Sequence, residues 1–350
     1  MKRAPYPSIA LSLLLLASNM RSPAGEQVFV LDKFLRENVR LNAGQIDSVH
    51  RGKAVAVVLD SPTPDEVFVF GTVYVEATPE SYLQLANDFD ALRKLPSYLA
   101  VQKFSSPPQS SDLGGFTIDA DDLKEVKSCK PRDCEVQLPS EAMEQFQKSI
   151  NWTAADAASQ ANRLAQQMAI QALLAYQKGG NAALGEYRDK DHPTRVAGTF
   201  QSLLGRLKSL PVYLPDLNRF LLEYPGVELA NSHSEFYWEK VDFGLKPTLR
   251  IVQQIIYRGS SPAGPVHAVA LKQLYASHYF QAALDLTVCT KDAARPNEQG
   301  FYLMTVKASQ QAGLTGLKGG ILRKVAVGKT RSSLEHTLTA IKQKLEAARR

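Results

Sequence analysis

The sequence predicts an α+β protein in which an antiparallel sheet packs against a long C-terminal helix. Two observations predict this fold class. Beyond residue 230, turn signals separate five β-prone segments, at 235–243, 248–257, 266–275, 279–289 and 300–308. Strands joined by such short loops pair antiparallel. The last segment has a capping box at 332–335 and an apolar helical stripe that needs a sheet to cover it, formed by Leu334, Leu338, Ile341 and Leu345.

An earlier strand and helices complete the predicted main domain. Residues 66–76 are rich in Val and Phe, and Thr78 followed by Pro79 is typical of a helix start. Helical pieces follow to about residue 95, and 97–104 has the composition of a strand. We therefore expect one α+β domain over 66–350. Before it we expect an N-terminal arm at 26–65, with a helical stretch and a short β-prone run at 28–41 and 54–59.

A helical insertion is predicted inside this domain, at 140–225. Residues 105–115 are rich in Ser, Pro and Gly, which indicates a loop, and short strand candidates follow at 116–118 and 134–138. From residue 140 the composition changes to Ala, Gln and Leu with helical periodicity. An amphipathic insertion has to lie on something apolar, so we expect it to act as a lid.

The first 25 residues have the pattern of a secretory signal peptide. Lys2 and Arg3 precede the apolar run 9–17, and small residues follow up to Ala24. The run is shorter than the roughly 20 residues needed to span a bilayer, and no later stretch reaches about 18 uninterrupted apolar residues. We expect cleavage near Ala24, no stable transmembrane anchor afterwards, and export to the periplasm or the cell exterior.

The charge balance gives little support for a nucleic-acid partner. The net charge of +6 includes Lys2, Arg3 and Arg21, whereas the segment 1–25 contains no acidic residue. Without that segment the charge falls to +3. A domain that binds nucleic acid usually has a strongly basic surface. We therefore expect no nucleic-acid binding.

Two of the three cysteines lie close together in the sequence. Cys129 and Cys134 enclose Pro131 and Asp133, and this spacing suits a local disulfide that closes a turn in an oxidising compartment. Two free thiols are the alternative. A metal site would need further ligands at fixed spacing, which are missing here, so no metal is predicted. Cys289 lies in an apolar strand pattern, which indicates a buried thiol.

The order of the predicted elements resembles that of the START-like, or helix-grip, fold. Folds of this kind wrap a curved sheet around the last helix and leave an apolar cavity between the two. Several stretches also resemble an uncharacterised family of exported bacterial proteins, over most of the chain after Gly25. These stretches are 122–123, 129–134, 187–189, 235–240, 276–280 and 313–324. The resemblance implies fold and export and assigns no catalytic residue.

This chain departs from that family's pattern in two places. Arg132 stands where Gly is usual, and Lys307, Ala308 and Ser309 stand where Asn-Arg-Ser is usual. The common hydrolase, metalloprotease and dinucleotide signatures, such as Gly-x-Ser-x-Gly and His-Glu-x-x-His, are absent from the sequence. No cofactor is therefore predicted, and the sequence leaves catalysis open.

His278 is the histidine with the most informative surroundings. It lies among aromatic residues at 275–280, where it would place an imidazole at the mouth of a cavity with Glu235 or Glu239 as a partner. The alternative is a hydrogen-bonded histidine in a turn between strands. A Gly-rich run at 313–320 precedes the predicted terminal helix, and is either a hinge, an anion-binding helix start or a site of close packing.

Aromatic side chains on the predicted strands suggest a ligand pocket. Tyrosine suits such a site because its ring contacts an apolar ligand while its hydroxyl orients a polar group. Alternation along the strand puts Tyr237 and Trp238 on opposite faces, so only some of these residues can line one pocket. An ordinary aromatic core is the alternative. The candidate ligand-binding residues are Tyr237, Trp238, Tyr257, Tyr275, His278, Tyr279 and Tyr302.

Three functions follow as hypotheses. The first is an exported protein that binds or carries an apolar small molecule or lipid in a cavity between the sheet and the C-terminal helix. The second is an enzyme that uses His278 and a carboxylate in the same cavity. The third is a cell-envelope scaffold that uses the helical insertion as its contact surface.

Overall fold

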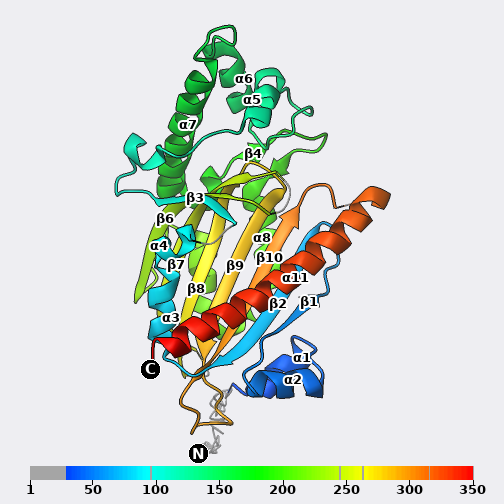
Figure 1. The fold of residues 1–350 in the computed structure, drawn as a ribbon, viewed down its shortest axis with the longest axis vertical. Coiled ribbons are helices and arrows are strands. Elements are labelled where there is room, and N and C mark those ends of the chain that lie inside the picture. Colours follow the sequence, from blue (N-terminus) through cyan, green and yellow to red (C-terminus); the bar gives the residue numbers. More distant parts are fainter. Residues whose placement is uncertain (1–28, 95–96, 244–245, 262–263, 315, 350) are drawn as a thin grey trace, which may run out of the picture.

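The computed structural model describes residues 29–94, 97–243, 246–261, 264–314 and 316–349, and the predicted signal peptide lies outside them. The described chain contains an eight-stranded sheet in the order β1-β2-β10-β9-β8-β7-β6-β3. Each neighbouring pair is antiparallel, so an α+β fold with an antiparallel sheet is confirmed (Figure 1). The strands are β1 (Val55–Leu59), β2 (Glu66–Val75), β3 (Tyr98–Lys103), β6 (Ser232–Val241), β7 (Thr248–Ser261), β8 (Gly264–Ala276), β9 (Phe280–Thr290) and β10 (Phe301–Gln311).

The five strands predicted after residue 230 form one meander, from β6 to β10. Strands β2 and β3 come from the N-terminal half of the chain and extend the meander at its two ends, beside β10 and β6. The predicted N-terminal arm supplies β1, which pairs with β2 and forms one edge of the sheet. The arm is thus part of the sheet through its β-prone run.

One face of the sheet is covered by the long C-terminal helix α11 (Gly316–Ala347), as predicted. The stripe residues Leu334 and Leu338 pack there with valines of β2. A Cβ atom at Gly71 of β2 would lie 2.7 Å from a methyl carbon of Leu338, so glycine allows this close crossing. Helices α3 (Pro79–Ala86) and α4 (Phe89–Arg93) lie on the same face.

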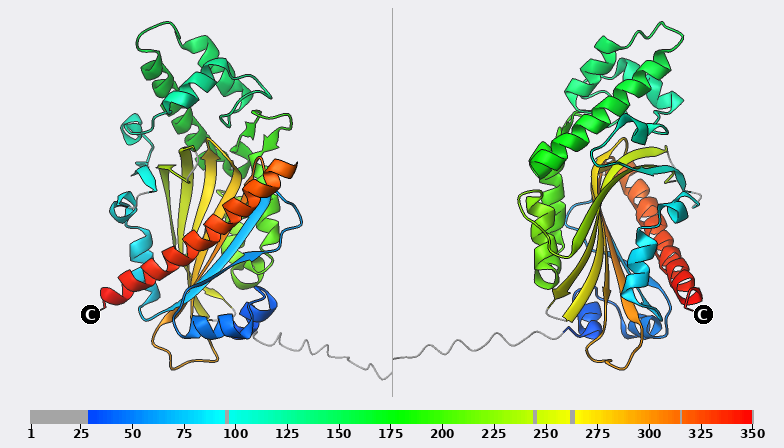
Figure 2. Two further views of the ribbon diagram at one scale, coloured as in Figure 1. Left: turned by 45° about the vertical axis from the view of Figure 1, so that its right-hand side comes forward. Right: turned by 90° about the vertical axis from the view of Figure 1, so that its left-hand side faces the viewer.

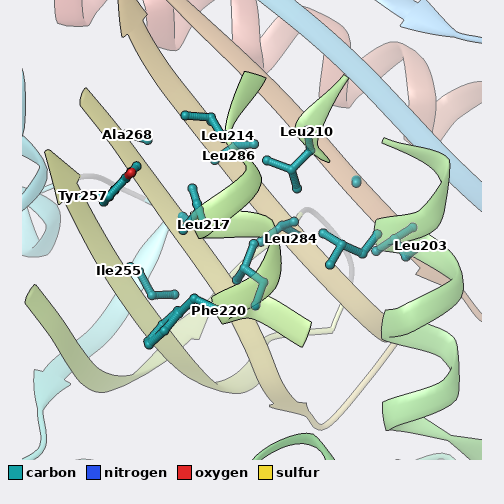
Figure 3. Close-up of a cluster of buried hydrophobic side chains, with 14 of the residues drawn as sticks. Leu203, Leu210, Leu214, Leu217, Phe220, Ile255, Tyr257, Ala268, Leu284 and Leu286 are labelled. Carbon is teal, nitrogen blue, oxygen red and sulfur yellow. The ribbon is translucent and has the colours of Figure 1, made fainter. Parts of the chain in front are cut away.

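The opposite face is covered by helices of the insertion. Leucine and phenylalanine side chains from α8 (Val196–Arg206), α9 (Leu210–Tyr213) and α10 (Pro215–Glu223) pack on β7, β8 and β9 (Figure 3). Helices α1 (Leu31–Glu37) and α2 (Ala43–His50) pack beside them on β2 and β10. The two views of Figure 2 show α11 and the α8–α10 helices on opposite sides of the sheet.

The first part of the insertion and the segment before it form a cap beyond one end of the strands. It contains α5 (Ala120–Ser128), α6 (Ser140–Ser149) and α7 (Ala157–Gly179), with a two-stranded ribbon of β4 (Glu186–Tyr187) and β5 (Thr194–Arg195) at its base. Figures 1 and 2 show this cap above the ends of β7 and β8. The predicted helical insertion therefore has two parts, a cap and a layer on the sheet.

The strands predicted at 116–118 and 134–138 are wrong, because both segments are irregular. Their backbone groups bond to scattered partners instead of a neighbouring strand. The Ile118 amide donates to the side chain of Asn162 at 2.8 Å, and the Gln137 amide donates to the Ser277 carbonyl at 2.8 Å. Short apolar runs do not distinguish a strand from such an extended segment.

The C-terminal helix also begins earlier than predicted. The capping box at 332–335 lies in the middle of α11, and part of the Gly-rich run forms the first helical turns. A Cβ atom at Gly319 would lie 2.5 Å from the Leu314 carbonyl carbon, so this glycine permits close packing of the helix on the preceding turn. The close-packing alternative for the Gly-rich run is therefore the one that the geometry favours at Gly319.

Candidate ligand-binding cavity

A cavity of about 660 Å³ lies between the cap and the ends of β7 and β8. It is on the face of the sheet that carries Leu249 and Ile251, opposite the face on which α11 packs. The sequence predicted a cavity between the sheet and the C-terminal helix, whereas this cavity lies on the other face of the sheet. Its main apolar lining residues are Phe116, Ile118, Val126, Val136, Leu138, Phe146, Met168, Leu173, Leu184, Val196, Leu249, Ile251 and Leu274.

Helix α7 gives the cavity its largest continuous wall. Its lining residues are at 165, 168, 169, 171, 172, 173, 175 and 176, so a broad face of the helix borders the cavity. Four of these positions are alanines, Ala165, Ala169, Ala172 and Ala175, whose small side chains leave space between the helix and the sheet. This face was visible in the sequence only as general helical periodicity, because alanine carries a weak apolar signal.

Tyr275 is the sequence-predicted residue that lines this cavity. Burial raises the pKa of its hydroxyl well above the ordinary range, with Tyr187 and Asp122 nearby contributing. Its ring packs edge-on against Tyr187, with 6.2 Å between ring centroids. The Tyr187 hydroxyl already has a protein partner, because it accepts a hydrogen bond from the Ala276 amide at 3.2 Å. The Tyr275 hydroxyl makes no such bond within the described chain.

Charged residues lie at the base of the cap, where the ribbon meets the cavity. Glu186 and Arg188 both line the cavity, and the Arg188 Nε lies 2.5 Å from a carboxylate oxygen of Glu186. The Nε of Arg195 lies 3.1 Å from the other oxygen. The side chain of Arg188 is half exposed. The cavity therefore combines an apolar interior with a charged, solvent-accessible side.

The cysteine turn lies within the cap, where the amides of Arg132 and Cys134 donate to the carbonyls of Arg188 and Asp189. Cys129 and Cys134 form a disulfide, which agrees with the prediction and with an exported protein. Just after it, the Gln137 side chain donates hydrogen bonds to the carbonyl oxygens of Ala276 and Phe280, at 2.9 and 3.1 Å. These bonds fix the wall segment 134–138 to the turn between β8 and β9.

His278 lies in that same turn and is fully buried. Its Nε2 lies 2.7 Å from the carboxylate of Asp122 in α5, and its Nδ1 lies 3.0 Å from the Glu135 carbonyl oxygen. The predicted partners were wrong: Glu235 pairs with Lys103 and His233, and Glu239 pairs with Arg250 at 3.1 Å. Sequence reasoning missed Asp122 because it lies 156 positions away. Both ring nitrogens face protein acceptors, so the imidazole holds the cap to the sheet.

The other predicted binding residues lie outside this cavity's lining. Trp238 is buried under the cap, where its Nε1 donates to the Asp112 carbonyl at 2.7 Å. Tyr237 points to the opposite face and packs on Phe89, so the predicted alternation is confirmed. Tyr279 lies in the β8–β9 turn, where its hydroxyl accepts a bond from the Lys246 amide.

Tyr257 and Tyr302 lie further away, towards the other end of the sheet. Tyr257 belongs to the core under α8–α10 and borders a separate, more polar hollow of about 540 Å³. Tyr302 packs under α1 and α2, where its hydroxyl lies 2.9 Å from Nδ1 of His50. The aromatic strand residues thus fill several cores, and one of them borders the cavity.

Two further features bear on the type of site. Within the described residues, no group of three or more His, Cys, Asp and Glu side chains is placed to hold a metal ion. No helix of the same residues is long and apolar enough to cross a membrane. Cys289 is a free, buried thiol in β9, as predicted, and burial raises its pKa well above the usual value.

Comparison of the chain with protein-family models finds no match, and comparison with curated protein sequences finds none either. The resemblance to a family of exported bacterial proteins therefore stays a prediction. The function has to be argued from the cavity and its surroundings.

Proposed function

We propose that this protein is an exported binder or carrier of an apolar small molecule, which it holds in the cavity between the cap and the ends of β7 and β8. The observation that carries the proposal is the cavity of about 660 Å³ with its largely apolar lining. Ligand sites for small molecules have volumes of about 300–1,000 Å³ and combine apolar walls with a few polar groups.

The polar groups suggest a ligand with one polar end. Tyr275 offers a hydroxyl inside the cavity, and Arg188 offers a guanidinium on the accessible side. Lipids and other amphipathic molecules have this combination of an apolar body and a polar end. Periplasmic or extracellular placement is part of the proposal and is supported by the disulfide.

We also propose that the fold is of the START-like, helix-grip type. The element order, the antiparallel sheet and the long C-terminal helix on one face support it. The ligand site that we propose is under the insertion, on the other face of the sheet. The insertion would then have created a separate site, for which the cap acts as the lid.

The enzyme hypothesis has weaker support. The pair of His278 and Asp122 borders the cavity only through Asp122, and both nitrogens of the imidazole already face acceptors. A general acid or base needs a nitrogen within reach of the substrate. The geometry therefore favours binding over catalysis at this residue.

Titration with diphenylhexatriene, a hydrocarbon that fluoresces in apolar surroundings, tests the binding proposal. We expect saturable binding of about one probe per chain, and we expect Ala172→Trp to weaken it by at least about tenfold because the new indole fills the cavity. Ala158→Trp is the matched control, since Ala158 is exposed on the same helix outside the cavity lining. Circular dichroism checks that both variants fold. Equal binding by the two variants, or no saturable binding by the unaltered protein, would refute the proposal.

A further inference from the structure

The N-terminal half of α11 exposes large aliphatic side chains to solvent. Ile321 is 69% exposed, and Leu322 and Val325 are each 51% exposed. Exposed single apolar residues are common, but three on adjacent positions of one helix form a patch. Figure 1 shows this end of α11 extending past the β1–β2 edge of the sheet, so the patch is accessible.

This patch is distinct from the helix face that packs on the sheet. A helix turns by about 100° per residue, which places Ile321, Leu322 and Val325 within an arc of about 100°. The buried residues Val327 and Leu338 fall on an arc centred about 180° away. Packing of α11 on β2 therefore does not account for the exposed aliphatic residues.

The charged residues that α11 itself carries around the patch all have one sign. Lys324, Lys329 and Arg331 are exposed and make no ion pair with any described residue. The sequence contains no acidic residue between Glu298 and Glu335. Arg323 has a different role, because its guanidinium donates to backbone carbonyls next to β2 and so holds the helix in place.

We propose that the N-terminal half of α11 docks on the surface of an anionic lipid bilayer. A helix with exposed aliphatic residues between basic ones inserts its apolar side into the boundary of headgroups and acyl chains, while the cations contact anionic headgroups. The patch carries aliphatic residues, whereas the hot spots of protein interfaces are rich in Trp, Tyr and Arg, so it suits a fluid bilayer better than a protein pocket. The proposal rests on α11 alone and stands whether or not the cavity binds a ligand.

Flotation with lipid vesicles tests this proposal. We expect the protein to float with vesicles of phosphatidylglycerol and phosphatidylethanolamine in equal parts, and to stay behind with vesicles of phosphatidylcholine. Raising the salt concentration from about 0.05 M to about 0.5 M should release it, because the electrostatic attraction is screened. Failure to float with the anionic vesicles would overturn the proposal.

Two sets of substitutions assign the binding to the patch. The triple change Ile321→Ser, Leu322→Ser and Val325→Ser should lower the bound fraction by at least about tenfold. The matched control changes exposed apolar residues on three other elements, which are 53%, 43% and 49% exposed. This control is Leu99→Ser, Leu174→Ser and Val212→Ser, and it should float like the unaltered protein.

Two other results would contradict the lipid surface as the occupant. If the patch variant floats as well as the control variant, the aliphatic residues do not contact the bilayer. If sedimentation instead reveals a dimer that the patch substitutions dissociate, and vesicles do not compete with it, a second copy of the chain covers the patch.

Discussion

Lys272 is unusual because lysine side chains are almost never fully buried without a charged partner. It is fully buried in β8, and no carboxylate in the described chain forms an ion pair with it. Its ammonium donates to the Tyr176 hydroxyl at 2.9 Å and to Asn181, and it lies 4.4 Å from the ring centre of Phe200. These neutral partners do not replace a counter-ion, so burial lowers the pKa of Lys272 to about 7.

This lowered pKa predicts a pH-dependent stability. Between about pH 7 and the ordinary lysine value near 10.5, the unfolded chain holds the proton that the folded chain has lost. Lys272 should therefore raise the free energy of unfolding by up to about 1.4 kcal/mol for each unit by which the pH rises across this window. Below about pH 7 both states are protonated, and this contribution to the slope disappears.

Urea unfolding at several pH values measures that slope. Lys272→Met should remove the contribution, whereas Lys178→Met, at an exposed position of α7, should keep it. The account of Lys272 fails if both variants show the same pH dependence.

We expect the hydroxyl of Tyr275 to contact the polar end of the ligand. Tyr275→Phe removes one hydroxyl and keeps the ring, so it should weaken binding of a fluorescent fatty alcohol by about 2- to 10-fold, the value of one neutral hydrogen bond. Binding of the hydrocarbon diphenylhexatriene should stay unchanged. Tyr237→Phe, on the opposite face of the sheet, should alter neither affinity. An equal loss for both probes would mean that the hydroxyl supports the fold rather than the ligand.

At the scale of single elements, two neighbouring glycines of α11 make a matched pair. A Cβ atom at Gly319 would lie within 3 Å of backbone atoms of Gly313 and Leu314, whereas one at Gly320 would meet nothing within 4 Å. Gly319→Ala should therefore destabilise the protein by about 1–3 kcal/mol. Gly320→Ala should stabilise it by up to about 1 kcal/mol, because alanine favours the helix. Thermal unfolding distinguishes them, and equal effects would contradict the packing of α11 on the preceding turn.

The same helix shows what the sequence could predict for elements. The stripe from Leu334 to Leu345 was predictable because its burial follows the helical period, and the five strands were predictable because turn signals separate β-prone segments. The start of α11 was not, since glycines are poor helix formers and here serve close packing with a turn. The segments 116–118 and 134–138 have strand composition, but contacts with Asn162 and Ser277 decide their conformation.

At the scale of the whole molecule, the sequence predicted that the insertion covers something apolar, but the face it covers could not be read from it. Periodicity reports which residues are buried and not which partner buries them. Lys272 illustrates this, because it lies in phase with the buried Ala268 and Ala270 and thus on a core face. Its neighbours Tyr176 and Asn181 come from the insertion, more than 90 positions earlier.

The candidate site was predictable only in part for the same reason. Tyr275 stood out as an aromatic residue on a strand, and the disulfide followed from the spacing of two cysteines. The alanine face of α7 and the pairing of His278 with Asp122 depend on how the cap folds over β7 and β8. Contacts between such distant segments leave no local pattern in one sequence.

The most direct test of the central claim is native mass spectrometry of the protein purified without detergent from the cells that produce it, followed by organic extraction. We predict one apolar or amphipathic molecule bound per chain in the unaltered protein and none in Ala172→Trp. A protein at its bare mass, with nothing apolar in the extract, would contradict the claim that the cavity under the cap holds a ligand.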